Sequence, residues 1–396
     1  MSFKGKTAII GYGDTKVGKF PERTSVDLAL EAARNALDSA GITAKDVDGL
    51  LTTRSFSDNV YDWGIGLLGE ELGISTSNMW QCFAGGASSS AMLDTAVGLI
   101  CSGMCDTMLL VCANKWGTQL SMSAAVGALA DLHHSDWERP YGFHQVSAAA
   151  LGTRRAMHEG NLTMEDFAHV CVSLRKWAQL NPLARYRDPL TVEEVLNARM
   201  VSDPYTLYMV PALSDGASAI VVSSAETAKK TVEIPVYILG GAGIFEFSGI
   251  TQAFRGKGTD VRSGARGGIG RKALEVAGIT IDDLDVRSIY EAYPIGLLLG
   301  MLSLGMAEDL RGVADIVNDG RIAPGGDLPT TTDGGMLSRG HAAISGGMMF
   351  KTEAVRQLRG EAGERQVKDA KFAYVSCMGG VGGVSYCEVL GTEVSK

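Results

Sequence analysis

A tyrosine, a histidine and a cysteine in the C-terminal third of the chain have side chains suited to proton transfer and to binding a negative oxygen. Tyr290 begins the segment YEAY, His341 lies in the turn SRGHA, and Cys377 begins the segment CMGG. Imidazole and thiol groups can exchange protons near neutral pH, and a tyrosyl O–H can donate a hydrogen bond to a developing enolate or alkoxide. These residue types predict acid–base chemistry on a substrate that develops charge on oxygen.

Each of the three also has an ordinary structural interpretation. His341 can be a hydrogen-bonded core histidine, Cys377 a small buried apolar side chain, and Tyr290 a strand aromatic. The chain has no CxxC pair of zinc-site spacing, so we predict free thiols and no metal site. The seven cysteines are Cys82, Cys101, Cys105, Cys112, Cys171, Cys377 and Cys387.

Charge and hydropathy exclude several classes of protein. The 396 residues include 36 Lys+Arg and 45 Asp+Glu, which gives a formal charge of −9, and no Lys/Arg-rich block could follow a phosphate backbone. The N-terminus lacks the sustained apolar stretch of a signal peptide, and the most apolar later stretch is interrupted by Asp94 and Asp106. We therefore expect a cytoplasmic protein with neither nucleic acid nor membrane as a partner.

An internal repeat indicates how the elements around these residues are organised. Residues 36–48 and 273–285 share eight of thirteen positions. Each copy reads as an amphipathic helix that ends at a glycine (Gly41 or Gly278), an Asp-rich turn and an apolar strand. Strand-like runs also precede both copies, so the pattern predicts two related α/β halves.

The predicted halves are residues 1–228 and 229–396, with a boundary in the polar segment SAETAKKTVE. Residues 115–212 interrupt the first half with a mixture of Trp, His, Arg and Pro and with two helical patterns, around 146–159 and 163–180. We interpret this segment as an inserted cap over the site.

Two small-residue turns are predicted to begin helices. One is AGGASSS at 84–90, and the other is LSRGH at 337–341, whose helix should continue to Gly360. The first N–H groups of a helix are free and its N-terminus carries a partial positive charge, so both turns are suited to a thioester oxygen or an anion.

The three C-terminal segments resemble motifs of the thiolase superfamily, in which Asn-Glu-Ala-Phe, Gly-His-Pro and Cys-x-Gly-Gly segments converge on the bond beside a CoA thioester. In this chain Ala342 replaces the usual Pro and Tyr290 replaces the Asn. The tyrosine resembles the lipid-transfer-protein-like branch and the thiolase-like steroid side-chain aldolases. The resemblance covers essentially the whole chain. It implies a duplicated α/β fold of two βαβαβαββ-type halves in a layered αβαβα arrangement, with the cap inserted.

The resemblance places the family's acylated cysteine at Gly86. Counting back without a gap from Ile100 aligns the family's Cys-x-Ser-Gly with Gly86-Ala-Ser-Ser. A glycine cannot form the usual acyl-enzyme. Cys82 is the alternative nucleophile, but an extended segment would place it about 13 Å from residue 86. It could substitute only through a bulge or a shifted turn.

The resemblance also implies a set of site residues and a cofactor requirement. The expected catalytic residues are His341, Cys377 and Tyr290. Coenzyme A is expected as a co-substrate or as part of the substrate, with no covalently bound cofactor. The expected substrate and oxyanion-loop residues are Gly86, Ser88, Gly340, Gly379 and Gly380.

Three functions remain open at this point. The leading one is CoA-dependent thiolysis of a 3-oxoacyl-CoA, favoured by the presence of His341 and Cys377. The second is retro-aldol cleavage of a 3-hydroxyacyl-CoA, favoured by Gly86 and Tyr290, although the thiolase-like aldolases tend to carry Tyr where this chain has His341. The third is a non-catalytic subunit that binds acyl-CoA or lipid. The resemblance further implies a homodimer and a small zinc-containing OB-fold partner subunit.

Overall fold

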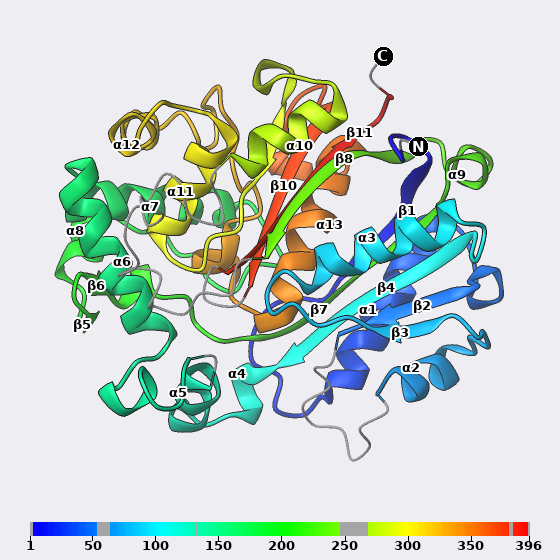
Figure 1. The fold of residues 1–396 in the computed structure, drawn as a ribbon, viewed down its shortest axis with the longest axis horizontal. Helices are drawn as coiled ribbons and strands as arrows, with labels where there is room; N and C mark the ends of the chain where they lie inside the picture. Colours follow the sequence, from blue (N-terminus) through cyan, green and yellow to red (C-terminus); the bar gives the residue numbers. More distant parts are fainter. Residues whose placement is uncertain (1–2, 54–63, 132, 246–267, 380–382, 395–396) are drawn as a thin grey trace.

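The computed structural model describes residues 3–53, 64–131, 133–245, 268–379 and 383–394. Within them, nine strands form one mixed sheet in the order β3-β2-β4-β7-β1-β8-β11-β10-β9 (Figure 1). The strands of this sheet are β1 (Thr7–Asp14), β2 (Gly49–Thr52), β3 (Met79–Gln81), β4 (Thr107–Lys115), β7 (Asp215–Ser224), β8 (Val236–Phe245), β9 (Val286–Ser288), β10 (Phe372–Gly379) and β11 (Val384–Gly391).

The sheet is built from two similar groups of strands that meet at its centre. The first strands of the two groups, β1 and β8, pair antiparallel through Ala8 with Tyr237 and Ile9 with Val236. Outward from this junction the orders are β1-β7-β4-β2-β3 and β8-β11-β10-β9. The predicted duplicated α/β fold is therefore confirmed, while the boundary between residues 228 and 229 stays a prediction.

The second group lacks a full counterpart of β3 within the described residues. A single parallel bridge between Arg287 and Thr330 lies at the edge of β9 instead. The segment that leads to Thr330 contains Pro324, two glycines and Pro329. Proline has no N–H to donate to a strand ladder, so this segment does not extend the pairing. The expected βαβαβαββ pattern is thus reduced by one strand in the second half.

The internal repeat corresponds to one structural unit used twice. Helices α1 (Ser25–Ala40) and α10 (Ile269–Ala277) end at Gly41 and Gly278, whose φ angles of 67° and 70° lie in the left-handed region. Each helix is followed by a short 3₁₀ turn that begins at a Thr-Asp capping box, and then by β2 or β9. Glycine adopts this positive φ without strain, which explains why both copies retain it.

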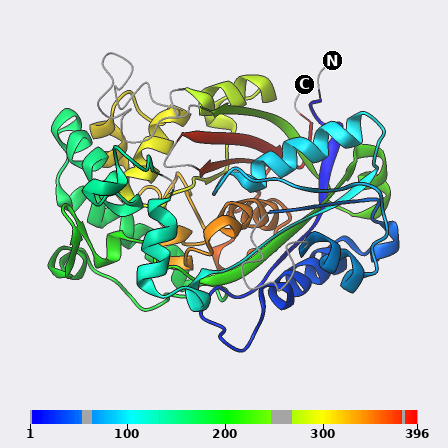
Figure 2. The same ribbon diagram turned by 60° about the horizontal axis from the view of Figure 1, so that its bottom comes forward.

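Two helices, α3 (Ser88–Cys101) and α13 (Gly346–Leu358), form the central layer. Both contact strands from both halves of the sheet. Figures 1 and 2 show α13 in orange and α3 in cyan between the two groups of strands, with α1 outside the first group and α10 outside the second. This is the predicted αβαβα layering. All thirteen residues of α13 are buried, including its charged ones.

The inserted segment forms a mainly helical region at one end of the molecule (Figure 1). Helices α6 and α7 confirm the two predicted helical patterns, and α7 packs against α11 and α12 of the second half. The predicted polar boundary segment carries the short helix α9. The elements not yet given are α2 (Gly64–Leu72), α4 (Trp116–Gln119), α5 (Met122–Ala130), α6 (Gln145–Gly160), α7 (Met164–Gln179), α8 (Val192–Asn197), β5 (Met200–Ser202), β6 (Tyr205–Thr206), α9 (Ala225–Thr231), α11 (Pro294–Leu304) and α12 (Leu310–Asn318).

None of the helices in the described ranges is both long enough and apolar enough to cross a membrane.

Candidate active site

The turn before α3 brings Gly86 against the hydroxyl of Tyr290. A Cβ atom built on Gly86 would lie 2.4 Å from Tyr290 Oη and 2.3 Å from the Met378 carbonyl oxygen. Both distances are far below normal van der Waals contact. The tyrosyl oxygen therefore fills the space that a side chain at residue 86 would need. Only glycine fits there while Tyr290 and Met378 keep their positions.

Tyr290 is held in this place by its neighbours. It follows β9, its backbone N–H donates to Ser376 Oγ at 3.1 Å, and its ring lies 5.7 Å from the ring of Phe350 on α13. Its side chain is almost fully buried. Since β9 and β10 pair in parallel, the chain that follows β9 emerges beside the end of β10, where Cys377 lies.

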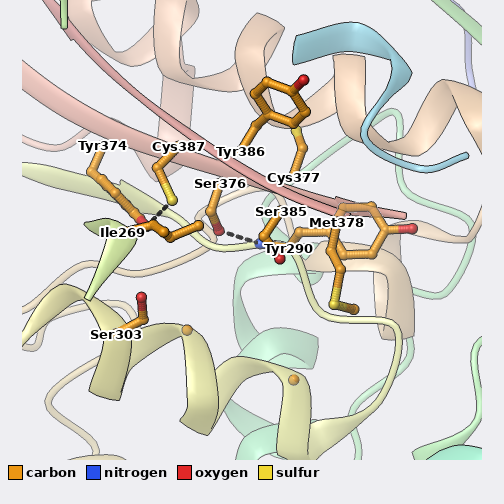
Figure 3. A pocket seen from close by; sticks show the side chains of 12 residues that line it. Ile269, Tyr290, Ser303, Tyr374, Ser376, Cys377, Met378, Ser385, Tyr386 and Cys387 are labelled. Atoms are coloured by element: carbon orange, nitrogen blue, oxygen red, sulfur yellow. Dashed lines mark hydrogen bonds between the residues drawn. The ribbon is translucent and has the colours of Figure 1, made fainter. Parts of the chain in front are cut away.

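Cys377 points from β10 into the central helical layer. Its sulfur lies 3.3 Å from Lys351 Nζ, 3.4 Å from the Gly347 carbonyl oxygen and 3.6 Å from Ser89 Oγ. The side chain of Cys377 lies on the opposite side of the strand from Ser376, as strand alternation requires (Figure 3). Gly86 lies near this sulfur as well as near Tyr290, because a Cβ on Gly347 would meet both the Gly86 carbonyl oxygen, at 2.4 Å, and Cys377 Sγ, at 3.3 Å.

A small cavity lies beside these residues, between α11 and the strands β10 and β11 (Figure 3). Tyr290 and Cys377 both contribute to its lining, together with serine hydroxyls and Tyr374, whose O–H donates to Cys387 Sγ at 2.8 Å. Two of the predicted site residues thus border this space, although the Cys377 sulfur itself points to the other side of β10.

The other predicted glycines of this region pack tightly. A Cβ on Gly379 would lie 2.0 Å from the Ala84 carbonyl oxygen, so the end of β10 lies directly against the turn before α3. Gly340 has a φ of 111° and lies next to Val17 and Ser214. Gly380 falls outside the described residues.

Ser88 closes the turn rather than facing an open space. Its hydroxyl accepts from the Ala84 N–H at 2.9 Å and donates to the Gly85 carbonyl at 2.6 Å, and its own N–H also donates to Gly85. A contact between Ser88 and substrate would require these hydrogen bonds to break. These contacts give no support to its predicted role in substrate binding. They indicate that Ser88 stabilises the Gly86 turn.

His341 is half-buried, and a hydrogen bond fixes the position of one of its ring nitrogens. Nδ1 accepts from the Ala343 N–H at 2.9 Å, which leaves the proton of the neutral ring on Nε2. The ring makes no other hydrogen bond within the described part of the chain. Burial lowers the pKa of His341 to about 4. The imidazole is therefore a neutral N–H donor at physiological pH, suited to a carbonyl or enolate oxygen.

The helix after His341 begins later than predicted. Residues 335–339 form a π-helical turn, a 3₁₀ turn follows at Ala343–Ser345, and α13 begins only at Gly346. The backbone of His341 is instead attached to the first half, because its N–H donates to Ala212 and its carbonyl accepts from Ser214. This pairing replaces the helical hydrogen bonds that the sequence pattern suggested, so His341 does not lie at a helix N-terminus.

The depressed pKa of His341 predicts a specific dependence of stability on pH. The folded value is about 4 and the usual unfolded value is about 6.5, so the unfolded chain binds one more proton between these pH values. The contribution of His341 therefore lowers stability as pH falls from about 6.5 to about 4. A His341→Gln variant should lose less of its thermal midpoint between pH 7 and pH 5 than the wild type does. Equal losses in both proteins would contradict the assignment of a neutral imidazole.

The Cys82 thiol contacts the side of α3. Its sulfur lies 3.8 Å from Thr95 Oγ1 on α3, and burial raises the pKa of Cys82, which disfavours the thiolate. The segment from Cys82 to Gly86 is turned, with a bridge between Ala84 and Gly86, so the extended-chain separation of 13 Å does not apply. The shorter path still leaves the Cys82 thiol directed to α3, and its use as a nucleophile stays a prediction without support from these contacts.

Lys351 is a site residue that the sequence analysis missed. Its ammonium group lies 2.9 Å from Ser90 Oγ, 3.3 Å from Ser89 Oγ and 3.2 Å from Glu388 Oε1, in addition to the Cys377 sulfur. The only local signal is a lysine within the otherwise apolar run MMFK of a central helix. Its partners come from α3, β10 and β11, and this spatial grouping is not visible in the sequence.

A buried ion network holds the turn that carries His341. Arg339, two residues before it, pairs with Asp333 at 2.8 Å and with Asp14 of β1 at 3.1 Å. Arg356 of α13 pairs with the same Asp14 at 2.8 Å and with Glu353 at 3.2 Å. The network connects the first strand of one half to the central helix of the other.

The fold and this site define a class of enzymes that act on the carbon–carbon bond next to a CoA thioester. A family model described as "Thiolase C-terminal domain-like" matches residues 256–392. An acetyl-CoA acetyltransferase of Methanocaldococcus jannaschii is 30% identical over 97% of this chain and 98% of its own. A steroid side-chain-cleaving aldolase of Thermomonospora curvata is 30% identical over 90% of this chain and 91% of its own.

A solved structure named "Ltp2-ChsH2(DUF35) aldolase" has a TM-score of 0.84 to this chain, with 28% identity and 98% coverage of both chains. The chain belongs to the thiolase superfamily, in the SCP2/thiolase-like branch that is related to the steroid side-chain aldolases. It is accordingly a thiolase-family enzyme that acts on a carbon–carbon bond of a CoA thioester. That Gly86 stands at the position of the family's cysteine stays a prediction from the sequence count.

Proposed function

We propose that this chain cleaves the Cα–Cβ bond of a 3-hydroxyacyl-CoA by a retro-aldol reaction, without a covalent acyl-enzyme. The observation that carries the proposal is the position of Tyr290 Oη in the space that a side chain at residue 86 would occupy. This reverses the order of preference reached from the sequence, where thiolysis came first. The similarity to two aldolases supports the same choice.

The proposed step uses three side chains. Tyr290 Oη binds the 3-oxygen, which loses its proton and becomes a ketone or aldehyde carbonyl as the bond breaks. The electron pair of that bond passes into the thioester as an enolate, whose oxygen accepts the N–H of His341 Nε2. Cys377, as a thiolate beside Lys351, accepts the proton of the 3-hydroxyl as the bond breaks, and the thiol that results delivers this proton to Cα of the enolate, which restores the thiolate. Donors aimed at the enolate oxygen supply the main stabilisation of the transition state.

Thiolysis is the second candidate. In this version the sulfur of CoA attacks the 3-oxo carbon of a 3-oxoacyl-CoA directly. The bond to Cα then breaks, and Cys377 protonates the same thioester enolate. The presence of both His341 and Cys377 favours it, as does the similarity to an archaeal acetyl-CoA acetyltransferase. The third hypothesis is a non-catalytic subunit that binds acyl-CoA. It predicts that substitution of His341 or Cys377 leaves turnover unchanged.

We also propose that the chain works as a homodimer with a small zinc-containing OB-fold subunit. The similar aldolase structure carries a second named component, ChsH2(DUF35), which supports the presence of a partner subunit. Co-expression with a candidate subunit of that kind, followed by measurement of the mass of the complex, tests this arrangement.

Product analysis by mass spectrometry distinguishes the three functions. The protein is incubated with branched 3-oxoacyl-CoA and tertiary 3-hydroxyacyl-CoA substrates, each with and without added CoA. We expect a free ketone or aldehyde and a shortened acyl-CoA from the hydroxy substrate without added CoA. Two acyl-CoA products that require CoA would establish thiolysis and contradict the retro-aldol proposal. Binding of both substrates without any product would support the non-catalytic reading.

A further inference from the structure

The central layer contains a buried cation beside the cysteine that the proposed reaction uses. Lys351 has no solvent exposure, and its Nζ lies 3.3 Å from Cys377 Sγ. Two serine hydroxyls of α3 and the Glu388 carboxylate complete its surroundings. Burying an ammonium group is costly unless it is paired, so a lysine kept here needs negative partners.

The charges around Lys351 favour a negative sulfur on Cys377. Burial opposes the charge on Lys351, but the Cys377 sulfur and the Glu388 carboxylate together hold its pKa above the usual value. Glu388 pairs with Lys351 in a single contact, at 3.2 Å through Oε1. Lys351 also directs an N–H donor at Sγ, which is the geometry that stabilises a thiolate.

We propose that Lys351 is a positioning residue that stabilises the thiolate form of Cys377 and thereby sets this cysteine as the proton carrier for Cα. The inference rests on the proposed function for the identity of the carbon that receives the proton. The sulfur is a thiolate before cleavage, takes the proton of the 3-hydroxyl as the bond breaks and gives it to Cα, so Lys351 stabilises the negative sulfur at the start and at the end of each turnover. In direct thiolysis the proton that the sulfur passes to Cα comes from the thiol of CoA, so the cycle balances in either reaction. This role is the same for retro-aldol cleavage and for direct thiolysis.

Three other titratable groups lie near Lys351 and Cys377. Asp94 on α3 and Tyr386 on β11 interact electrostatically with Glu388, and Asp94 also does so with Lys351. Cys112 on β4 lies within electrostatic range of Lys351 and Cys377, but burial raises its pKa and keeps it a thiol. Among these neighbours Lys351 is the group placed to stabilise a negative charge on Cys377.

The test is a titration of Cys377 that needs no substrate. The thiolate is followed by its ultraviolet absorbance, with the spectrum of a Cys377→Ser variant subtracted to remove the other cysteines. Lys351→Met keeps most of the side-chain volume and removes the charge, so it should raise the pKa of Cys377 by about one to three pH units. Glu388→Gln keeps the shape and frees the lysine from its carboxylate, so it should lower the same pKa.

The two variants are expected to shift the pKa of Cys377 in opposite directions, which a merely structural role would not do. If Lys351 and Glu388 only tie α13 to β11, both variants lose stability and neither moves the titration of Cys377, which would overturn the proposal. If Lys351→Met does not fold, Glu388→Gln alone decides, and an unchanged or raised Cys377 pKa contradicts the proposal. Product analysis of the wild type is independent of this titration, so failure of the proposed reaction is recognised separately.

Discussion

A Tyr290→Phe variant is expected to retain acyl-CoA binding and to lose about 10²–10³-fold in kcat for carbon–carbon cleavage. The substitution removes only the oxygen that lies against Gly86 and leaves the ring packed on Phe350. Loss of a donor that stabilises the reacting oxygen affects the transition state more than the bound substrate. Steady-state kinetics with the substrate found by product analysis, together with calorimetric binding of an acyl-CoA, measure both quantities.

Tyr293 provides a matched control for this experiment. It lies in the same segment, is equally buried and stacks on Tyr205 at a ring distance of 5.2 Å. Tyr293→Phe removes the same atom three residues away and should leave kcat unchanged. A similar effect of both substitutions, or no effect of Tyr290→Phe, would contradict the assignment of Tyr290. Gly86→Ala should also reduce kcat, because its methyl group displaces the Tyr290 hydroxyl.

An Asp14→Ala variant is expected to lose about 3–5 kcal/mol of unfolding free energy. Asp14 is buried on β1 and accepts hydrogen bonds from Ser218 at 2.5 Å and from Thr352 at 2.9 Å, in addition to its ion pairs with Arg339 and Arg356. Removing its carboxylate leaves two buried guanidinium groups without that partner. Denaturant unfolding of the wild type and the variant measures the difference.

The pKa of Asp14 adds a check on this prediction. Burial would raise the pKa of this carboxyl, but Arg339 and Arg356 hold it below the usual value of 3.8. Its stabilising contribution is therefore complete above pH 3.8 and is lost as pH falls through the lower folded pKa. The exposed pair Arg321–Asp327 has a contact of 2.6 Å and serves as the control. Asp327→Ala should change the unfolding free energy far less than Asp14→Ala, because solvent screens an exposed pair, and an equal cost for both variants would contradict the role of the buried network.

Local sequence patterns predicted much of the fold because they depend on neighbours in the chain. The repeat at Gly41 and Gly278 predicted two similar units, since a helix that ends at a left-handed glycine is specified within a few residues. Helices α6 and α7 followed from their periodicity. The start of α13 was wrong because the backbone of His341 pairs with residues 212–214 of the other half, and that pairing has no local signal.

The candidate site was predictable only in part. Tyr290, His341 and Cys377 were found because each lies in a short segment that resembles a family motif. Lys351 was not found, because its significance comes from Cys377 and Glu388, which join it only in the folded chain. The contact between Gly86 and Tyr290 joins residues about two hundred positions apart and required the structure.

The close approach of Gly86 to Tyr290 has a consequence for how this site could change over evolutionary time. A nucleophilic side chain at residue 86 meets both the tyrosyl oxygen and the Met378 carbonyl. Replacing Tyr290 alone removes the oxygen on which the proposed reaction depends, and replacing Gly86 alone displaces it. The two positions are therefore epistatic: any path to an acyl-enzyme mechanism must pass through an impaired intermediate, in which residue 290 is smaller and the Met378 carbonyl has moved before residue 86 is enlarged.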